Sequence, residues 1–331
     1  MKSKHVMNKH DKIFVAGGYG LVGSAIIRRL KREGFYNIIT RSHSELDLMD
    51  KAATQAFFES ERPDYVFMAA AKVGGLQANL EALDKFMYVN TMIEFNTIMS
   101  AFDTGVKKFC FLGSGCIYPR ICPQPIKESY LLTAPLELTN EGYALAKISG
   151  LKLCEYLNTH YPDKADYISV MPCNLYGPND NYHPEHSHVI PALLRKFHDA
   201  KVNGKNEVVL WGTGSAMREF MHIDDMASAC VFLMQNYSGD PSDTPNTPGE
   251  SWVNVGYGSD MTIAELAGRI AKVVGFNGTI TYDHIHPDGT PRKLLDSSKL
   301  FGLGWRPSVS FDDGLKETYE DYKINKDNYR R

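Results

Sequence analysis

A hydroxyl and a thiol stand two residues apart in the stretch LGSGCIYP, which runs from Leu112 to Pro119. The apolar residues before it predict a buried strand, and the small residues predict a tight turn at the end of that strand. Such a turn presents the hydroxyl of Ser114 and the thiol of Cys116 side by side, and Cys116 could be a second reactive group, because surroundings can tune a thiol to titrate near neutral pH. A cysteine at a strand end is also commonly a small buried apolar residue, so the turn alone leaves both interpretations of Cys116 open.

A tyrosine and a lysine stand four residues apart in NEGYALAKISG, which places Tyr143 and Lys147 on one face of a predicted helix. An ammonium held near a phenol favours the phenolate and lowers the pKa of the phenol. A tyrosine tuned in this way can exchange a proton with a carbonyl or a carbinol, which is the proton step that hydride transfer needs. The same spacing occurs in many surface helices, so the pair is informative only together with other motifs.

Three glycines, Gly17, Gly20 and Gly23, follow the first predicted strand at intervals of three. Glycine lets the backbone turn tightly and approach a pyrophosphate, which then lies at the positive end of the following helix. The motif alone is also compatible with a strand-to-helix turn that binds nothing. At the end of the second strand, Arg41 stands where an acidic residue would contact the ribose of NAD, which favours NADP. Asp47 could take the ribose role instead, with Arg41 as a solvated charge.

These motifs can form one site only if the fold places the ends of several strands close together. The order of the predicted strands and helices indicates such a fold. From Lys12 to about Gly177, apolar runs of strand length alternate with amphipathic helical segments. Continuous apolar strands separated by helices predict a parallel sheet covered on both faces, so the predicted fold class is a Rossmann-type doubly wound α/β sheet. In that fold the residues that follow the strands meet at one edge, where ligands bind.

The composition changes after Gly177, and we predict a smaller C-terminal α/β domain that binds the substrate. The predicted boundaries are 12–177 for the NADP-binding domain, with returning segments near 220–257, and 178–219 with 258–331 for the substrate-binding domain. A helix is predicted at 262–275, because Thr262 and Glu265 form a capping-box pattern and Gly275 ends it. The stretch YSGDPSDTPNTPGES, 237–251, is expected to be an exposed loop.

Composition and charge restrict the classes of function. The chain has 331 residues, 43% of them hydrophobic, and a formal net charge of -3 at pH 7. Without a dense run of lysine and arginine, no nucleic acid or anionic membrane is expected as a partner, and no apolar run is long enough to span a bilayer. The six cysteines are scattered without CxxC pairs, which favours reduced thiols in a cytoplasmic protein. Cys110, Cys154 and Cys230 fall on apolar faces and are expected in the core.

The glycine turn, Ser114 after a strand, and Tyr143 with Lys147 in the next helix together resemble the extended short-chain dehydrogenase/reductase family, over essentially the whole chain. The resemblance implies that Ser114 orients the substrate oxygen, that Tyr143 donates the proton, and that Lys147 binds the nicotinamide ribose. It also implies that PCNLYGP, from Pro172, lines the nicotinamide pocket. The residues expected to contact NADP(H) are Gly17, Gly18, Tyr19, Gly20, Leu21, Val22, Gly23, Arg41, Ala70, Leu112, Gly113, Lys147, Pro172, Asn174, Leu175 and His188.

Within that family, the turn GSGCIYP lacks the acidic residue that follows the serine or threonine in dehydratases of nucleotide sugars, and a simple 4-epimerase would need no thiol. Four stretches resemble the bifunctional epimerase-reductases of the family, which convert GDP-4-keto-6-deoxy-D-mannose to GDP-L-fucose with NADPH. They are AAAKVGG, LGSGCIYP, NLYGPNDNYHPEHSHVIPALLRKF and PDGTPRKLLD. Those enzymes often have a serine where this chain has Gly115, a difference expected to affect hydrogen bonding to the cofactor more than the chemistry.

The resemblance implies that Cys116 and His188 are the epimerisation pair. A C4 ketone acidifies the protons at C3 and C5, so inversion needs a base on one face of the sugar and an acid on the other. A thiol and an imidazole can both serve near pH 7. We favour Cys116 as the base and His188 as the acid, and the reverse direction stays open. The cluster HPEHSH could suggest a metal site, but no further ligand stands at a suitable spacing, so no metal is expected.

The GDP part of such a substrate needs cations for its diphosphate and a surface for its guanine. By resemblance, the residues expected to contact the substrate are Lys196, Trp211, Arg218, Asp288, Arg292 and Lys293. Trp211 could equally be an aromatic residue of an interdomain core. The apolar faces of helices around 83–100 and 142–157 are expected to form a four-helix homodimer interface, which is common in the family.

Two other functions stay open on the sequence. One is a 3,5-epimerase of an intact GDP-hexose that oxidises its substrate only transiently with NAD. The other is a cofactor-sensing binding module on the same fold, which the complete set of Ser114, Tyr143 and Lys147 argues against.

Overall fold

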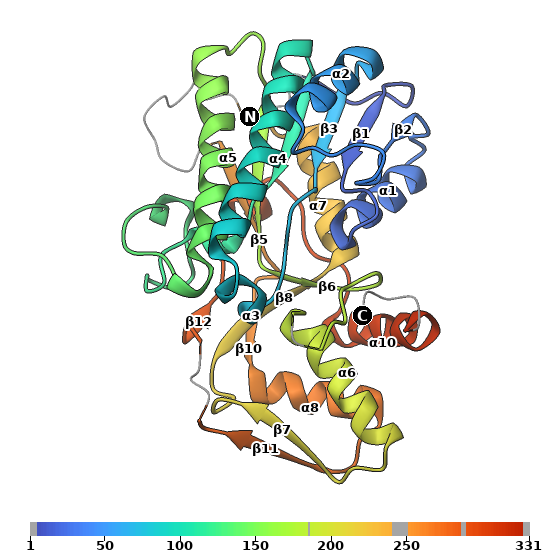
Figure 1. The fold of residues 1–331 in the computed structure, drawn as a ribbon, viewed down its shortest axis with the longest axis vertical. Helices are drawn as coiled ribbons and strands as arrows, with labels where there is room; N and C mark the ends of the chain where they lie inside the picture. Colours follow the sequence, from blue (N-terminus) through green and yellow to red (C-terminus); the bar gives the residue numbers. More distant parts are fainter. Residues whose placement is uncertain (1–4, 185, 240–250, 286–288, 327–331) are drawn as a thin grey trace.

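A computed structural model of the chain describes residues 5–184, 186–239, 251–285 and 289–326. Its central element is a six-stranded parallel sheet with the strand order β2-β1-β3-β4-β5-β9 (Figure 1). The strands are β1 (Ile13–Ala16), β2 (Ile38–Ile39), β3 (Tyr65–Met68), β4 (Lys108–Leu112), β5 (Tyr167–Pro172) and β9 (Trp252–Val255). The strand order reverses between β1 and β3, and a doubly wound sheet binds its ligands at such a reversal.

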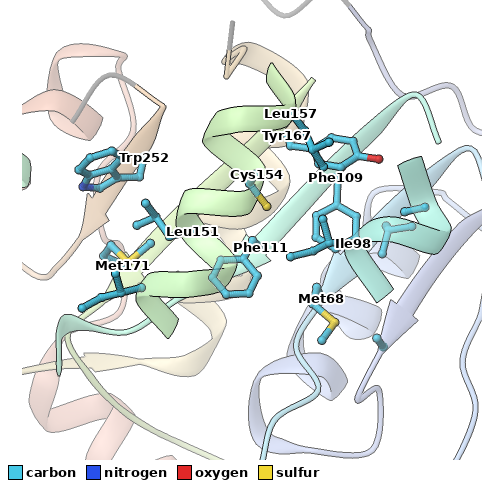
Figure 2. Close-up of a cluster of buried hydrophobic side chains, with 14 of the residues drawn as sticks. Met68, Ile98, Phe109, Phe111, Leu151, Cys154, Leu157, Tyr167, Met171 and Trp252 are labelled. Atoms are coloured by element: carbon cyan, nitrogen blue, oxygen red, sulfur yellow. The ribbon is translucent and has the colours of Figure 1, made fainter. Parts of the chain in front are cut away.

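Helices cover both faces of this sheet, and its central strands are therefore buried along their whole length. One face carries α1 (Leu21–Arg32) and α7 (Ile223–Asn236), and the other carries α2 (Lys51–Glu61), α4 (Leu83–Thr104) and α5 (Glu141–His160). Figure 2 shows part of the hydrophobic core between the sheet and the helices α2, α4 and α5. There Phe109 and Phe111 of β4 lie near Ile98 of α4. Leu151 and Cys154 of α5 lie near the same strand. The predicted Rossmann-type fold is confirmed.

The C-terminal half forms a smaller set of strands and helices that begins where β5 ends (Figure 1). Its strands are β6 (Asn174–Tyr176), β7 (Glu207–Trp211), β8 (Met217–His222), β10 (Asp260–Thr262), β11 (Thr279–Asp283) and β12 (Arg292–Lys293). β8 pairs with β6, β10 and β12, and β7 pairs with β11. The core of this half lies among α6 (Val189–Val202), α8 (Ile263–Val274) and α10 (Phe311–Asn325). Short helical elements are α3 (Leu76–Leu80), α9 (Ser298–Gly302), η1 (Gly115–Ile117), η2 (Glu128–Tyr130) and η3 (Leu138–Asn140).

The helix predicted at 262–275 is α8, and both of its ends have the expected chemistry. Thr262 Oγ1 accepts a hydrogen bond from Glu265 N at 3.1 Å, and the Glu265 carboxylate accepts one from Thr262 N at 2.9 Å, which completes the capping box. Gly275 ends the helix with φ 75°, a conformation that favours glycine. Most of the predicted loop, 240–250, lies outside the described residues. Within the described ranges, no helix is both long and apolar enough to cross a membrane.

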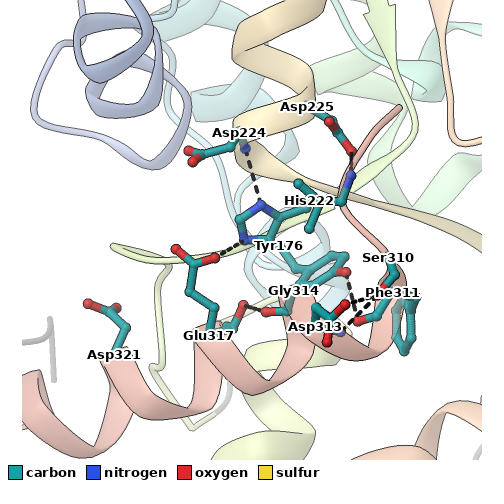
Figure 3. Close-up of polar contacts among 12 residues, drawn as sticks. Tyr176, His222, Asp224, Asp225, Ser310, Phe311, Asp313, Gly314, Glu317 and Asp321 are labelled. Carbon is teal, nitrogen blue, oxygen red and sulfur yellow. Dashed lines mark hydrogen bonds and ion pairs between the residues drawn. The ribbon is translucent and has the colours of Figure 1, made fainter. Parts of the chain in front are cut away.

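Polar and aromatic contacts join α10 to the dinucleotide half of the molecule (Figure 3). Asp225 of α7 accepts hydrogen bonds from the backbone N–H groups of residues 308 and 309, both at 3.0 Å, just before α10 begins. Tyr176 donates to the carbonyl oxygen of Phe311 at 3.2 Å. Gly314 permits this approach, because a Cβ at that position would lie 2.7 Å from Tyr176 Oη.

One part of the segment predicted to bind substrate packs against the dinucleotide half instead. Leu300 of α9 and Trp305 are buried in the core cluster of β1, β3, α1 and α7, and Trp305 Nε1 donates to Ser228 Oγ at 3.2 Å. These residues therefore extend the first half beyond the returning segments near 220–257, which hold α7 and β9. Short irregular apolar stretches have no periodicity that could assign them to one core or the other.

Candidate active site

The glycine turn after β1 is shaped by close backbone approaches. Gly17 has φ 76°, and a Cβ at this position would lie 2.7 Å from Ala70 N, in the segment after β3. A Cβ at Gly23 would lie 2.2 Å from the carbonyl oxygen of Gly17, so α1 can begin this close to the turn only with glycine there. The first turn of α1 has no acidic residue, and no described side chain caps its N–H groups. These N–H groups and the helix dipole suit a pyrophosphate.

The residues predicted to contact NADP(H) come from the carboxyl ends of neighbouring strands. Residues 17–23 follow β1, Arg41 follows β2, Ala70 follows β3, Leu112 and Gly113 end β4, Pro172 ends β5, and Asn174 and Leu175 lie on β6. His188 comes from a different place, the residue before α6. Contact of each with a cofactor stays a prediction.

Arg41 lies just after β2, and its guanidinium is held by α2. Nη2 lies 2.6 Å from Glu61 Oε1, and the same carboxylate lies 3.3 Å from Lys12 Nζ. Lys12 also interacts electrostatically with Asp64, so the charges around Glu61 balance, and the role of Arg41 at a 2'-phosphate stays a prediction. Asp47, the alternative ribose ligand, lies in an exposed loop 3.7 Å from His43 Nδ1.

The structure brings Ser114, Tyr143 and Lys147 together between β4 and α5. Lys147 Nζ donates to the carbonyl oxygen of Leu112, the last residue of β4, at 2.9 Å. The same Nζ lies 5.8 Å from the centroid of the Tyr143 ring. Ser114, at the N-cap of η1, hydrogen-bonds Tyr143 through its side chain. The half-buried hydroxyl of Ser114 and phenol of Tyr143 therefore lie close to the buried ammonium of Lys147.

The expected effect of Lys147 on Tyr143 is wrong, because the pKa of Tyr143 is raised rather than lowered. Burial is the main cause, negative charge at Cys116 and at Glu94 adds to it, and the hydrogen bond with Ser114 opposes it. Lys147 Nζ lies 3.0 Å from Glu94 Oε1, so its charge is already balanced by a carboxylate. Tyr143 is consequently a neutral phenol at pH 7, which is the state that a proton donor needs.

Glu94 is a site residue that was not predicted from the sequence. Its side chain on α4 is 0% exposed, beside a Lys147 side chain that is 2% exposed. Burial raises the pKa of Glu94, while Lys147 lowers it. Gly150 makes room for this carboxylate in α5, since a Cβ there would lie 2.6 Å from Glu94 Oε2. The available signal was a single acid in the apolar helical stretch TMIEFNTIM, because a buried carboxylate requires a partner.

Cys116 lies in η1, and its thiol is partly accessible. Its backbone N–H donates to Ser114 Oγ at 3.1 Å, and its Sγ accepts a hydrogen bond from Asn140 Nδ2 at 3.2 Å. The effect of its charge on the pKa of Tyr143 shows that the thiol and the phenol lie within electrostatic reach. A sulfur with a polar partner differs from the apolar thiol of Cys110, which is buried as predicted.

His188 precedes α6 in a loop that is tied to α3. Its imidazole is accessible to solvent, yet enough protein surrounds it that desolvation lowers its pKa. Gly75 N donates to the carbonyl oxygen of His186 at 2.8 Å, and a Cβ at Gly75 would lie 2.4 Å from the carbonyl oxygen of Ser187. Since α3 also packs against η3, the AAAKVGG segment connects the His188 loop with the element that ends at Asn140.

The other histidines of the HPEHSH cluster make contacts of their own. The rings of His183 and His186 stack with centroids 4.5 Å apart, and His186 Nε2 lies 3.4 Å from Glu81 Oε2. In the part of the chain that the structure describes, no group of three His, Cys, Asp or Glu side chains could hold a metal ion.

The cations predicted to bind the diphosphate lie on opposite sides of the sheet formed by β8 and β12. Arg218 on β8 and Lys293 on β12 are register partners, so they lie side by side. Arg292 faces the opposite side, as neighbouring residues on a strand do, and its guanidinium binds both oxygens of Asp260 at 2.6 and 3.1 Å. The arrangement favours Lys293 over Arg292 beside Arg218.

The remaining predicted substrate residues lie on α6 and β7. Trp211 ends β7 and is 62% exposed, so it is not an interdomain core residue. Lys196 donates to the carbonyl oxygen of Val209 on the same strand, and burial lowers the pKa of this lysine. Asp288 lies outside the described residues.

With this geometry in view, comparison with known protein families matches residues 13–252 to one family model. The chain belongs to the NAD dependent epimerase/dehydratase family. Relatives of this epimerase/dehydratase include GDP-L-fucose synthase 1 of Arabidopsis thaliana, 56% identical over 96% of this chain and 95% of the relative. GDP-L-fucose synthase of Escherichia coli (strain K12) is 50% identical over 97% of this chain and 99% of its own length.

Solved structures of the same epimerase/dehydratase fold agree with the sequence relatives. A GDP-L-fucose synthetase from Naegleria fowleri bound to NADP is 28% identical, with a TM-score of 0.89, and the match covers 100% of both chains. The family resemblance predicted from the sequence is confirmed. The named relatives fit the predicted epimerase-reductase and not the alternative GDP-hexose 3,5-epimerase.

Proposed function

We propose that this epimerase/dehydratase converts GDP-4-keto-6-deoxy-D-mannose to GDP-L-fucose, by inverting C3 and C5 and then reducing C4 with NADPH. Relatives named GDP-L-fucose synthase, 56% and 50% identical over nearly the whole chain, support this assignment. The observation that carries it is the turn after β4. This turn places Ser114 and Cys116 beside Tyr143. A reductase needs the serine, but reduction alone does not need a cysteine whose sulfur accepts a hydrogen bond.

Epimerisation is assigned to Cys116 and His188. The Cys116 thiolate takes a proton from C3 or C5, and the electron pair moves onto the C4 oxygen as an enolate. Hydrogen bonds from Ser114 and Tyr143 stabilise that oxygen. His188 then returns a proton to the carbon from the other face; because desolvation lowers the pKa of this imidazole, only its protonated fraction acts as the acid at pH 7. This leaves a thiol and a neutral imidazole, and proton exchange with water restores both before the second centre inverts.

Reduction is assigned to Ser114, Tyr143 and Lys147. NADPH, when bound, supplies the hydride that adds to C4 of the inverted sugar. Tyr143 gives its proton to the C4 oxygen, and its raised pKa keeps the phenol protonated until then. Lys147 holds the nicotinamide ribose, from a position fixed by the carbonyl oxygen of Leu112 and by Glu94. Each turnover consumes one hydride and one proton.

The cofactor and the substrate are assigned to separate groups of residues. The N–H groups at the start of α1 hold the pyrophosphate of NADP, and the guanidinium of Arg41, just after β2, holds its 2'-phosphate. The NADP-bound Naegleria fowleri structure supports this choice of cofactor. Arg218 and Lys293 bind the diphosphate of GDP, while the exposed Trp211, with Lys196 nearby, offers a stacking surface for guanine.

We also propose that the protein is a cytoplasmic homodimer. Exposed apolar side chains lie on α4 and α5, the helix pair at one side of the molecule in Figure 1: Met87, Tyr88, Phe95 and Tyr156. A four-helix interface with a second copy would cover them. The free cysteines fit a reducing compartment.

The direct test is incubation of the purified protein with GDP-4-keto-6-deoxy-D-mannose and NADPH. We expect NADPH to be consumed and GDP-L-fucose to form, and the absence of both with folded protein would refute the proposed function. In deuterated water, Cys116→Ser should slow exchange of the C3 and C5 protons by about 100-fold or more, because general-base catalysis is lost. Unchanged exchange in this variant, with NADP binding intact, would remove Cys116 from the role of base.

A further inference from the structure

The side chain of Asn140 hydrogen-bonds the sulfur of Cys116 instead of capping the helix that it precedes. Asn140 ends η3 and is the N-cap residue of α5, where an asparagine usually accepts a hydrogen bond from the first turn of the helix. Among the described residues its side chain makes no such cap. Instead, Nδ2 donates to Cys116 Sγ at 3.2 Å, across 24 positions of sequence. The side chain therefore contacts the sulfur of Cys116 and makes no N-cap hydrogen bond to α5.

The amide oxygen of Asn140 lies on the side of the amide away from the sulfur contact. Oδ1 is buried, and no described group hydrogen-bonds it. The sulfur of Cys116 is therefore the one side-chain hydrogen-bond partner that the described residues give this amide. An N–H donor at a sulfur stabilises the thiolate over the thiol, because hydrogen bonding to a charged form favours that form.

The same helix start also fixes the phenol. Asn140 and Tyr143 are three residues apart, so one rigid turn of α5 sets the distance between the group that contacts the sulfur and the group assigned to the C4 oxygen. The sulfur of Cys116 also lies within electrostatic reach of the Tyr143 phenol.

We infer that Asn140 is a positioning residue for epimerisation, which hydrogen-bonds the sulfur of Cys116, aims it at the sugar carbons and stabilises the thiolate when the thiol loses its proton. The role in epimerisation rests on the proposed function. The ionisation of the Cys116 thiol can be measured without the sugar substrate. An asparagine suits the task because it donates without carrying charge, whereas an aspartate would repel a thiolate.

The test uses the NADP-bound protein and the variants Asn140→Asp and Asn140→Leu, which remove the donor with and without added charge. Iodoacetamide labelling of Cys116, located by tandem mass spectrometry, is followed at pH 7 and pH 10. We expect the pH 7 rate to fall about tenfold or more in both variants, as for loss of a hydrogen bond to a charged group. The pH 10 rate should stay within about twofold, because every accessible thiol is then ionised.

A purely structural role of Asn140 would instead lower both rates or neither, and either result would overturn the inference. Asn96→Asp is the matched control, since Asn96 is a buried asparagine that binds backbone carbonyls far from the thiol. It should lower the melting temperature without changing the ratio of the two labelling rates.

A second measurement separates this inference from the proposed function. Deuterium uptake at C3 and C5 of GDP-4-keto-6-deoxy-D-mannose should fall about tenfold in both Asn140 variants, with NADPH affinity unchanged. If the unmodified protein exchanges no deuterium, the proposed function fails, and the labelling ratio still decides the role of Asn140. Full exchange in variants with an altered labelling ratio would show that the amide does not serve epimerisation.

Discussion

The buried ion pair of Glu94 and Lys147 decides how Tyr143 can work. Burial is the main cause of the raised pKa of Tyr143, and the Glu94 carboxylate, 3.0 Å from the Lys147 ammonium, raises that pKa further. A neutral phenol suits both halves of the proposed reaction, since it can donate a hydrogen bond to an enolate oxygen and later a proton to an alkoxide.

Glu94→Gln should change both stability and the pH profile of reduction. Removing one partner of a buried ion pair destabilises a protein by about 3–5 kcal/mol, so the melting temperature should fall. The charge of Glu94 raises the pKa of Tyr143, so the substitution should lower that pKa. Since the phenol must be protonated to donate, the alkaline loss of NADPH oxidation should move to lower pH. A folded variant with an unchanged alkaline limb would contradict this role.

Asp180, between β6 and α6, predicts a pH-dependent instability. Oδ1 accepts a hydrogen bond from Asn181 N at 2.7 Å, Oδ2 has no partner among the described residues, and burial raises the pKa of Asp180 to about 7. A carboxyl whose pKa is higher in the folded state stabilises the fold below the unfolded pKa of about 4 and loses that contribution as pH rises to about 7. Asp180→Asn should therefore be more stable than the unmodified protein at pH 8, by about 2–4 kcal/mol.

Thermal denaturation at pH 4, 6 and 8 would check this expectation. The advantage of Asp180→Asn should shrink towards zero at pH 4, where the carboxyl is protonated in both states. Asp163→Asn, at an exposed aspartate, is the control and should show no such trend. Equal stability of Asp180→Asn and the unmodified protein at pH 8 would refute the argument.

At the scale of elements, the loop that carries His188 depends on a glycine from another part of the chain. Gly75→Ala should push the backbone at residues 186–187 away from α3, because the new Cβ would lie 2.4 Å from the carbonyl oxygen of Ser187. Displacement of an acid by about 1 Å can cost about 100-fold in rate. We expect C3 and C5 exchange to fall at least tenfold while NADPH binding persists.

Gly268→Ala is the matched control for that substitution. Gly268 lies in α8, and a Cβ there would meet nothing within 4 Å. The variant should exchange C3 and C5 protons at the normal rate. Normal exchange in Gly75→Ala as well would show that the loop adjusts without moving its histidine.

At the scale of the whole molecule, the exposed apolar side chains of α4 and α5 predict assembly. Phe95→Glu places a charge on the face proposed to meet a second copy, and desolvating that charge would oppose association. Light scattering after size-exclusion chromatography should give twice the chain mass for the unmodified protein and a single chain mass for Phe95→Glu. Tyr36→Glu, at an exposed tyrosine after α1, should stay dimeric. A monomeric unmodified protein would refute the interface.

Local spacing was enough to identify the fold and much of the site. The alternation of apolar strands and helices indicated a doubly wound sheet, and the spacing of Tyr143 and Lys147 placed both on α5, because helix and strand periodicities are properties of neighbouring residues. The glycine turn after β1 and the capping box of α8 were predictable for the same reason.

Contacts between distant segments were not predictable, because no local period relates their residues. Glu94 reaches Lys147 from another helix, Asn140 reaches Cys116 from beyond a long loop, and the pKa of Tyr143 has the opposite shift to the expected one. Strand pairing likewise put Lys293 rather than Arg292 beside Arg218. The sequence alone thus specified the elements and the reacting groups, while their protonation and partners depended on burial and on long-range packing, which arise only when the chain is folded.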